Sequence, residues 1–137
     1  ELRGVKYYNS SIDSSPNRTI HTLSVFRENV VLIAGGKDKN IPYDALGPAI
    51  CGKVKTLILV GPTSDKIEAA VRAADSSQKD MIKIYHFKNY ADAVKCAYEN
   101  SVPGDTVLLS PASTSFDLFR NFEERGDVFK SLVRALE

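Results

Sequence analysis

The chain alternates between short apolar runs and longer segments in which apolar residues recur at helical spacing. Short, nearly continuous apolar runs bounded by polar turns are typical of buried strands. They predict five strands, over residues 5–8, 30–34, 55–60, 81–87 and 106–109. The intervening spacing predicts five helices: one from residue 16, one from 42, one over 65–74 capped by Thr63 or Ser64, and two over 90–98 and 127–136.

Prolines indicate where two of these helices begin and where one of them is interrupted. Ser15 followed by Pro16 is a capping residue with proline at the first helical position, which marks a helix start. We expect Pro42 to begin the next helix in the same way. Gly47-Pro48 then predicts a break or kink near the middle of that helix, because proline lacks the backbone donor that a helix interior needs.

The strand and helix pattern predicts an α/β domain with a Rossmann-like, open, mostly parallel sheet covered by helices on both faces. We expect residues 1–137 to form this single domain, beginning with a right-handed β-α-β unit. Polar loops follow the strands that end near residues 8, 34 and 109. Ligands bind at the carboxyl edge of such sheets, so these loops should meet at one site.

The most unusual loop covers residues 110–129, SPASTSFDLFRNFEERGDVF. Its hydroxyl residues 113–115 are suited to capping a short helix and to binding an anion, and its phenylalanines 116, 119 and 122 would share one helix side. A purely structural interpretation is also open. The serines would then be an ordinary cap, the phenylalanines core residues, and residues 123–125 a solvated face ended by Gly126.

Three stretches together resemble the Mur ligases, and most closely the members that add D-glutamate to UDP-N-acetylmuramoyl-L-alanine. The specific one is SPASTSFDLFRNFEERG at residues 110–126. Residues 35–39, GGKDK, resemble the family's GG-x-D-K loop, and residues 8–15, YNSSIDSS, stand where the family has a segment like NDSKATN. The resemblance covers nearly the whole chain and implies its C-terminal domain.

The resemblance implies a D-glutamate site. Lys39 would contact the substrate, and Ser115 and Phe122 would hold its carboxylates through a hydroxyl and backbone N–H groups. Asn121 would fix the turn, and Ser14 matches a substrate-binding threonine. A lone lysine or phenylalanine is more often a solvated or core residue, so these roles rest on the family pattern.

Nucleotide contact is implied at Asn9 and Ser10, although the chain has Ser10 and Ile12 where the family usually has Asp and Lys. Asp38 is suited to steadying its own loop by a backbone hydrogen bond. We predict no catalytic residue and no metal ligand in this chain.

The implied reaction is ATP-driven amide formation. ATP phosphorylates the carboxylate of UDP-N-acetylmuramoyl-L-alanine with Mg²⁺, and the D-glutamate amine displaces phosphate. The G-x-x-x-x-G-K-[ST] loop that binds ATP phosphates does not occur in this sequence. The ATP and UDP-sugar domains would therefore lie outside this chain, which we expect to be a fragment, inactive alone, since it opens without Met.

Net charge and cysteine content limit the partners and the cellular compartment that we expect for this protein. A net charge of +1 gives no electrostatic reason to expect nucleic acid or an anionic membrane as partner. Cys51 and Cys96 are isolated and suggest buried thiols of a reduced, cytoplasmic protein, which we expect to be a monomer. Two alternatives stay open: a free-standing nucleotide-binding or regulatory α/β module, and another amino-acid-adding ligase such as a folylpolyglutamate synthetase.

Overall fold

A five-stranded sheet forms the centre of the domain in a computed structural model that describes residues 2–27, 29–74, 82–115 and 118–136. Its strand order is β1-β5-β2-β3-β4, and every neighbouring pair is parallel. The strands are β1 Lys6–Asn9, β2 Val30–Ala34, β3 Val54–Val60, β4 Lys83–Phe87 and β5 Thr106–Leu109. The predicted strands and the α/β class are confirmed, except that Met81 lies outside the described residues.

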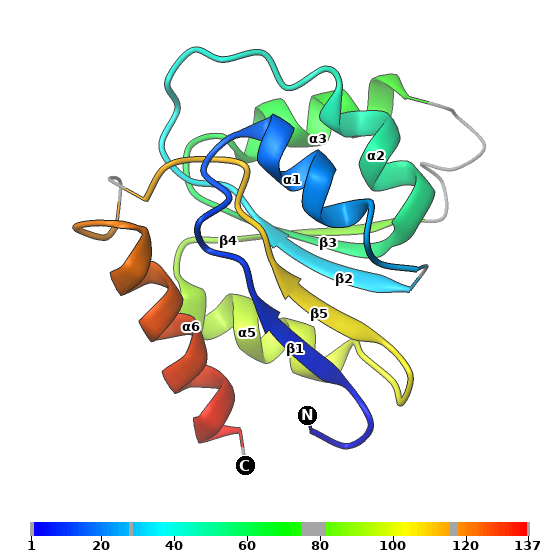
Figure 1. The fold of residues 1–137 in the computed structure, drawn as a ribbon, viewed down its shortest axis with the longest axis vertical. Helices are drawn as coiled ribbons and strands as arrows, with labels where there is room; N and C mark the ends of the chain where they lie inside the picture. Colours follow the sequence, from blue (N-terminus) through cyan, green and yellow to red (C-terminus); the bar gives the residue numbers. More distant parts are fainter. Residues whose placement is uncertain (1, 28, 75–81, 116–117, 137) are drawn as a thin grey trace.

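Helices cover both faces of the sheet (Figure 1). One face carries α1 Pro16–Leu23, α2 Leu46–Lys53 and α3 Ser64–Ala73, and the other carries α5 Tyr90–Glu99 and α6 Phe122–Ala135. Alternate residues of a strand point to opposite faces, so Leu32 packs in the first core and Ile33 in the second. Both faces of β2 must therefore be apolar, which explains its uninterrupted run of buried residues.

The start of α1 is confirmed, whereas the start of α2 differs from the prediction. Ser15 accepts a hydrogen bond from the backbone N–H of Arg18 at 3.4 Å, with Pro16 in the first turn. The second helix begins at Leu46 rather than at Pro42. Pro48 consequently falls in its first turn, where a missing N–H costs nothing, and no break is needed.

The C-terminal region also differs. In the described part of this region, residues 113–115 and 118–121 are not helical, and the final helix, α6, begins earlier than predicted with Asn121 as its cap. Gly126 lies inside α6 instead of ending it, and an added Cβ would come within 2.7 Å of the Asn9 amide nitrogen. Phe119 packs edge-on against Tyr90, while Phe116 lies outside the described residues.

The cysteines and the helices bear on two expectations drawn from composition. Cys51 and Cys96 are both buried, and neither is in a disulfide. None of the helices in the described ranges is long and apolar enough to cross a membrane.

Candidate functional site

The three polar loops meet at the carboxyl edge of the sheet, as predicted. Main-chain hydrogen bonds join them: Gly35 N–H donates to Pro111 O at 2.8 Å and Ala112 N–H donates to Asp13 O at 2.9 Å. The N–H of Lys37 donates to Thr114 O at 3.0 Å. Because β5 lies between β1 and β2 in the sheet, the loop after β5 contacts both of the others.

A buried carboxylate holds the first loop to the third. Asp13 is 3% exposed, and its Oδ2 accepts hydrogen bonds of 2.7 Å from the hydroxyls of Ser10, Thr22 and Ser110. A carboxyl group this deeply buried needs such hydrogen-bond partners around it. Asp13 is therefore a structural centre of this edge, and the hydroxyl proton of Ser10 is committed to it.

A buried arginine holds the same loops from the other side. Arg125 is 1% exposed and reaches from α6 across the edge. Its Nε donates to Ser11 Oγ at 2.9 Å, its Nη1 to Ser113 O at 2.8 Å, and its Nη2 to Ser11 O and to Ser14 Oγ. One planar guanidinium thus fixes two loops, which a lysine with its single ammonium cannot do in the same geometry.

Sequence reasoning assigned no role to Arg125, and the purely structural interpretation of residues 123–125 was a solvated face. One signal was present: Arg125 precedes the buried Phe129 by four residues, so both lie on the inward side of α6. An arginine on the buried stripe of an amphipathic helix indicates internal acceptors.

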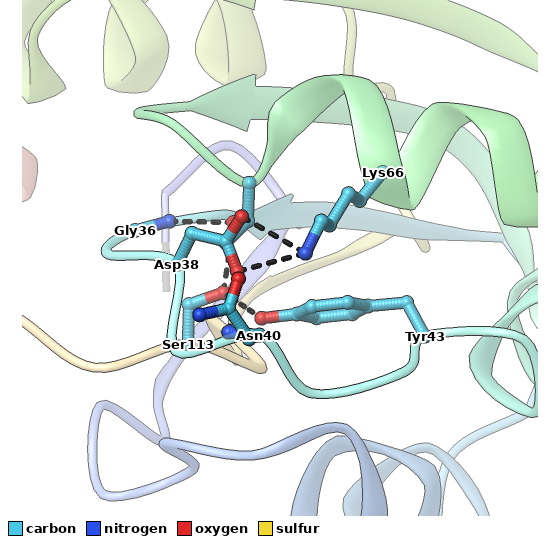
Figure 2. A network of polar contacts seen from close by, with 7 residues as sticks. Gly36, Asp38, Asn40, Tyr43, Lys66 and Ser113 are labelled. Carbon is cyan, nitrogen blue, oxygen red and sulfur yellow. Dashed lines mark hydrogen bonds and ion pairs between the residues drawn. The ribbon is translucent and has the colours of Figure 1, made fainter.

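The GGKDK loop is held by a chain of hydroxyls beneath it (Figure 2). The N–H of Gly36 donates to Thr63 Oγ1 at 3.0 Å, and Ser113 Oγ lies 2.8 Å from that oxygen and 2.8 Å from the Tyr43 hydroxyl. Thr63 was one of two predicted caps of α3. It occupies the N-cap position but makes no side-chain cap hydrogen bond, because its hydroxyl supports the loop.

Close packing requires both glycines here. Gly35 has φ +110°, and an added Cβ would lie 2.2 Å from Val60 O. At Gly36 it would lie 2.4 Å from Thr114 O. Neither position has room for a larger residue without backbone movement.

Asp38 steadies its loop as predicted and also forms an ion pair that was not predicted. Its Oδ1 accepts from Asn40 N–H at 2.8 Å, and both carboxylate oxygens lie 2.9 Å from Lys66 Nζ. The hydrogen bond from Lys66, followed by that from Asn40, lowers the pKa of Asp38 below its ordinary value. Lys39, which lies between Asp38 and Asn40 in the chain, is exposed.

Comparison with known proteins identifies the family. Residues 2–113 match the family "Mur ligase, glutamate ligase domain". The chain belongs to this family. It is 54% identical over 140 residues to the UDP-N-acetylmuramoylalanine–D-glutamate ligase of Ruminiclostridium cellulolyticum, and 53% identical over 139 residues to that of Acetivibrio thermocellus. Each match covers 100% of this chain and 30% of the relative, so the chain spans about a third of their length.

Within this Mur ligase domain, Lys39 and Ser115, which are both expected to bind substrate, lie on two adjoining loops. Lys39 and Ser115 flank the Lys37–Thr114 bridge. Ser115 is 2% exposed, and its carbonyl accepts from Phe119 N–H at 2.8 Å, which forms a turn.

Asn121 fixes the start of α6, as expected, by accepting from Glu124 N–H at 2.8 Å. Phe122 is the first residue of α6, its side chain is 37% exposed, and its carbonyl accepts from Ser11 Oγ at 2.7 Å. The main chain at Phe122 is thereby tied to the loop after β1.

The remaining predicted residues lie on the loop after β1. Ser14 is half-buried and accepts from Arg125 at 3.4 Å. Asn9 accepts from Ser11 N–H at 3.0 Å and packs against Gly126. Since Ser10 is also bonded to Asp13, both predicted nucleotide-binding side chains already make contacts within the domain.

One group of potential metal ligands occurs among the described residues. Ligand atoms of Asp65, Glu68 and His86 lie within 4.8 Å of one another. Glu68 is already paired with Arg72 and His86, which lower its pKa, Arg72 more strongly. Asp65 stands in the first turn of α3, where the positive end of the helix dipole opposes a cation. We therefore assign no metal to this group.

Proposed function

We propose that this chain is the C-terminal domain of an ATP-dependent ligase that joins D-glutamate to UDP-N-acetylmuramoyl-L-alanine in peptidoglycan synthesis. The observation that carries the proposal is that the GGKDK loop and the NFEERG start of α6 both contact residues 113–114 at one sheet edge, in a chain 54% identical to a ligase of that name. The whole enzyme would work in the cytoplasm as a monomer.

The chemistry of D-glutamate suits this edge. The substrate carries two carboxylates, which need donors from different directions. Lys39 would offer an ammonium from one loop, and Ser115, which is 2% exposed in the free domain, would offer a hydroxyl from the adjoining one. The first backbone N–H groups of α6 begin at Phe122 and point out of the N-terminal end of the helix. Such an end favours an anion. Ser14 would complete the site from the loop after β1.

This domain would bind and orient the amino acid, so that its amine faces the activated carboxylate of the sugar substrate. ATP supplies the phosphoryl group for that activation, and Mg²⁺ neutralises charge on the phosphoryl oxygens. The described residues fit the amino acid better than the nucleotide, because Asn9 and Ser10 are engaged within their loop. ATP, its metal and the UDP-sugar would therefore bind mainly to the rest of the ligase.

A titration of the 137-residue chain followed by amide NMR tests the binding site. D-glutamate should shift the signals of Lys39, Ser115, Asn121 and Phe122, and L-glutamate should shift them less. Equal shifts with both isomers, or shifts elsewhere, would contradict a D-glutamate site on this edge.

Lys39→Ala should weaken D-glutamate binding about 10- to 100-fold, since hydrogen bonds to charged groups contribute about 1.5–3 kcal/mol. Lys37→Ala is the matched control, because Lys37 is an exposed lysine of the same loop. Its effect should stay below about threefold, consistent with loss of an exposed surface charge. Equal losses would indicate a general charge effect rather than a contact at Lys39.

A chimera tests the reaction. This chain would replace the corresponding domain of the Ruminiclostridium cellulolyticum ligase, with which it is 54% identical. We expect ATP-dependent incorporation of D-glutamate by the chimera and no turnover by the 137-residue chain alone. Incorporation of another amino acid would support a different ligase of the superfamily. A folded but inactive chimera, with nucleotide binding to the free chain, would support a separate regulatory module.

A further inference from the structure

Lys66, on α3, lies 28 residues after Asp38 in the chain, but it contacts the GGKDK loop directly. Its Nζ lies 2.9 Å from both oxygens of the Asp38 carboxylate. Figure 2 shows the Lys66 side chain reaching toward the loop above the ring of Tyr43. Lys66 is not among the site residues that the resemblance to Mur ligases predicts.

The Asp38 carboxylate bonds to the main chain on the far side of Lys39. Asp38 Oδ1 accepts from the backbone N–H of Asn40 at 2.8 Å, so the side chain of one flanking residue closes a turn onto the other. Asn40 adopts φ +60°, a left-handed conformation for which asparagine is suited. The direction in which Lys39 leaves the main chain is therefore set by where the Asp38 carboxylate is held.

Lys66 holds that carboxylate against a rigid element. The neighbouring Ile67 is 0% exposed, and Ala70 and Val71 of the same helix are also buried in the core. The carboxylate thus bridges a packed helix and the turn that carries Lys39. On the other flank, the Lys37–Thr114 and Gly36–Thr63 hydrogen bonds hold the loop through its main chain.

We propose that Lys66 is a positioning residue for substrate binding: it fixes the Asp38 turn and thereby directs the Lys39 ammonium at the carboxylate of the bound amino acid. This inference rests on the proposed function, since it assigns the ammonium of Lys39 to D-glutamate. Lys66 and Asp38 are 42% and 31% exposed, so water competes for the pair and global stability gains little from it. We expect the Lys66–Asp38 pair to affect the orientation of the Lys39 side chain instead.

The test is a double-mutant cycle on D-glutamate affinity in the 137-residue chain, with Lys66→Met, Asp38→Asn and the double variant. Asparagine keeps an oxygen to accept from Asn40 but loses the ion pair. Each single variant should weaken binding about 3- to 10-fold, and the double variant should bind no worse than Lys66→Met. Lys66→Arg should retain most of the affinity, because a guanidinium can also pair with the carboxylate.

Direct contact of Lys66 with the substrate gives the opposite pattern. Asp38→Asn would then release Lys66 and leave affinity unchanged or improved, while Lys66→Met alone would weaken binding. Additive losses in the double variant would overturn the proposal as well. Lys95→Met, which removes an exposed lysine of α5, controls for net charge and should change affinity less than twofold.

A measurement without ligand separates this inference from the proposed function. In Lys66→Met, the amide signals of residues 38–40 should shift and the Asn40 amide should exchange faster with solvent, while the melting temperature stays within about 2 °C. If the wild-type chain does not bind D-glutamate but these changes occur, the proposed site fails and the coupling of Lys66 to the loop stands. Unchanged amides at 38–40 would overturn the coupling itself.

Discussion

Two anchors hold the same edge of the sheet, and they differ in burial. Arg125 and Asp13 form a buried network, 1% and 3% exposed, that joins the loops after β1 and β5 to α6. Asp38 and Lys66 form an exposed pair on the GGKDK loop. The difference in burial indicates different roles. The buried network determines the positions of the loops, and the exposed pair affects the orientation of the Lys39 side chain.

The physical basis is the cost of losing a partner. Truncating a buried side chain leaves its former partners unsatisfied away from water, at about 1–3 kcal/mol for each group. Partners of an exposed pair are simply hydrated, so a surface ion pair typically contributes about 0–1 kcal/mol. Substitutions at the two anchors should therefore separate stability from binding.

Arg125→Met should have the largest effect on folding. The carbonyls of Ser11 and Ser113 lose their buried donors, and we expect a loss of about 3 kcal/mol in the free energy of unfolding, measured by urea denaturation. Arg120→Met is the matched control, because Arg120 is 85% exposed and its pair with Glu124 lies within one turn. A loss below about 1 kcal/mol at Arg125 would show that the buried network is not the stronger anchor.

Gly36→Ala should come next. The added Cβ would lie 2.4 Å from Thr114 O, and relieving the contact requires the two loops to separate, at about 1–3 kcal/mol. Gly52→Ala is the control with the opposite sign. Gly52 lies in α2 with no atom within 4 Å of the added Cβ, so alanine should stabilise the domain by up to about 1 kcal/mol. Equal stability of both variants would contradict tight packing of the loops.

Glu68→Gln should have the smallest effect and depends on pH. Arg72, and to a lesser extent His86, hold the pKa of Glu68 below its ordinary value of 4.5. A lowered folded pKa stabilises the protein above the ordinary pKa, and this contribution disappears as pH falls through the lowered value. The variant should lose less than about 1 kcal/mol at pH 7, and its melting temperature should converge with the wild type in acid. A constant difference between the two proteins at all pH values would contradict an ionic contribution.

Much of the site could be predicted because its motifs are local. Lys39, Ser115, Asn121 and Phe122 follow from stretches whose order and spacing resemble one family, and the chain belongs to that family. Their roles in substrate binding stay predictions. The partners of Arg125 could not be identified from local pattern, because its acceptor Ser11 is 114 residues away in the chain.

The sequence by itself determined the five strands, the start of α1 and the meeting of the loops at one edge. A strand buried on both faces must be apolar throughout, and Ser15-Pro16 satisfies a helix start without help from distant residues.

Only the tertiary structure decided which polar groups are buried and where α2 begins. Tyr43 is 4% exposed and its hydroxyl meets Ser113 from another loop, while the helix begins only at Leu46. A buried polar side chain is stable only when its partners are in place, and the fold brings those partners from distant parts of the chain.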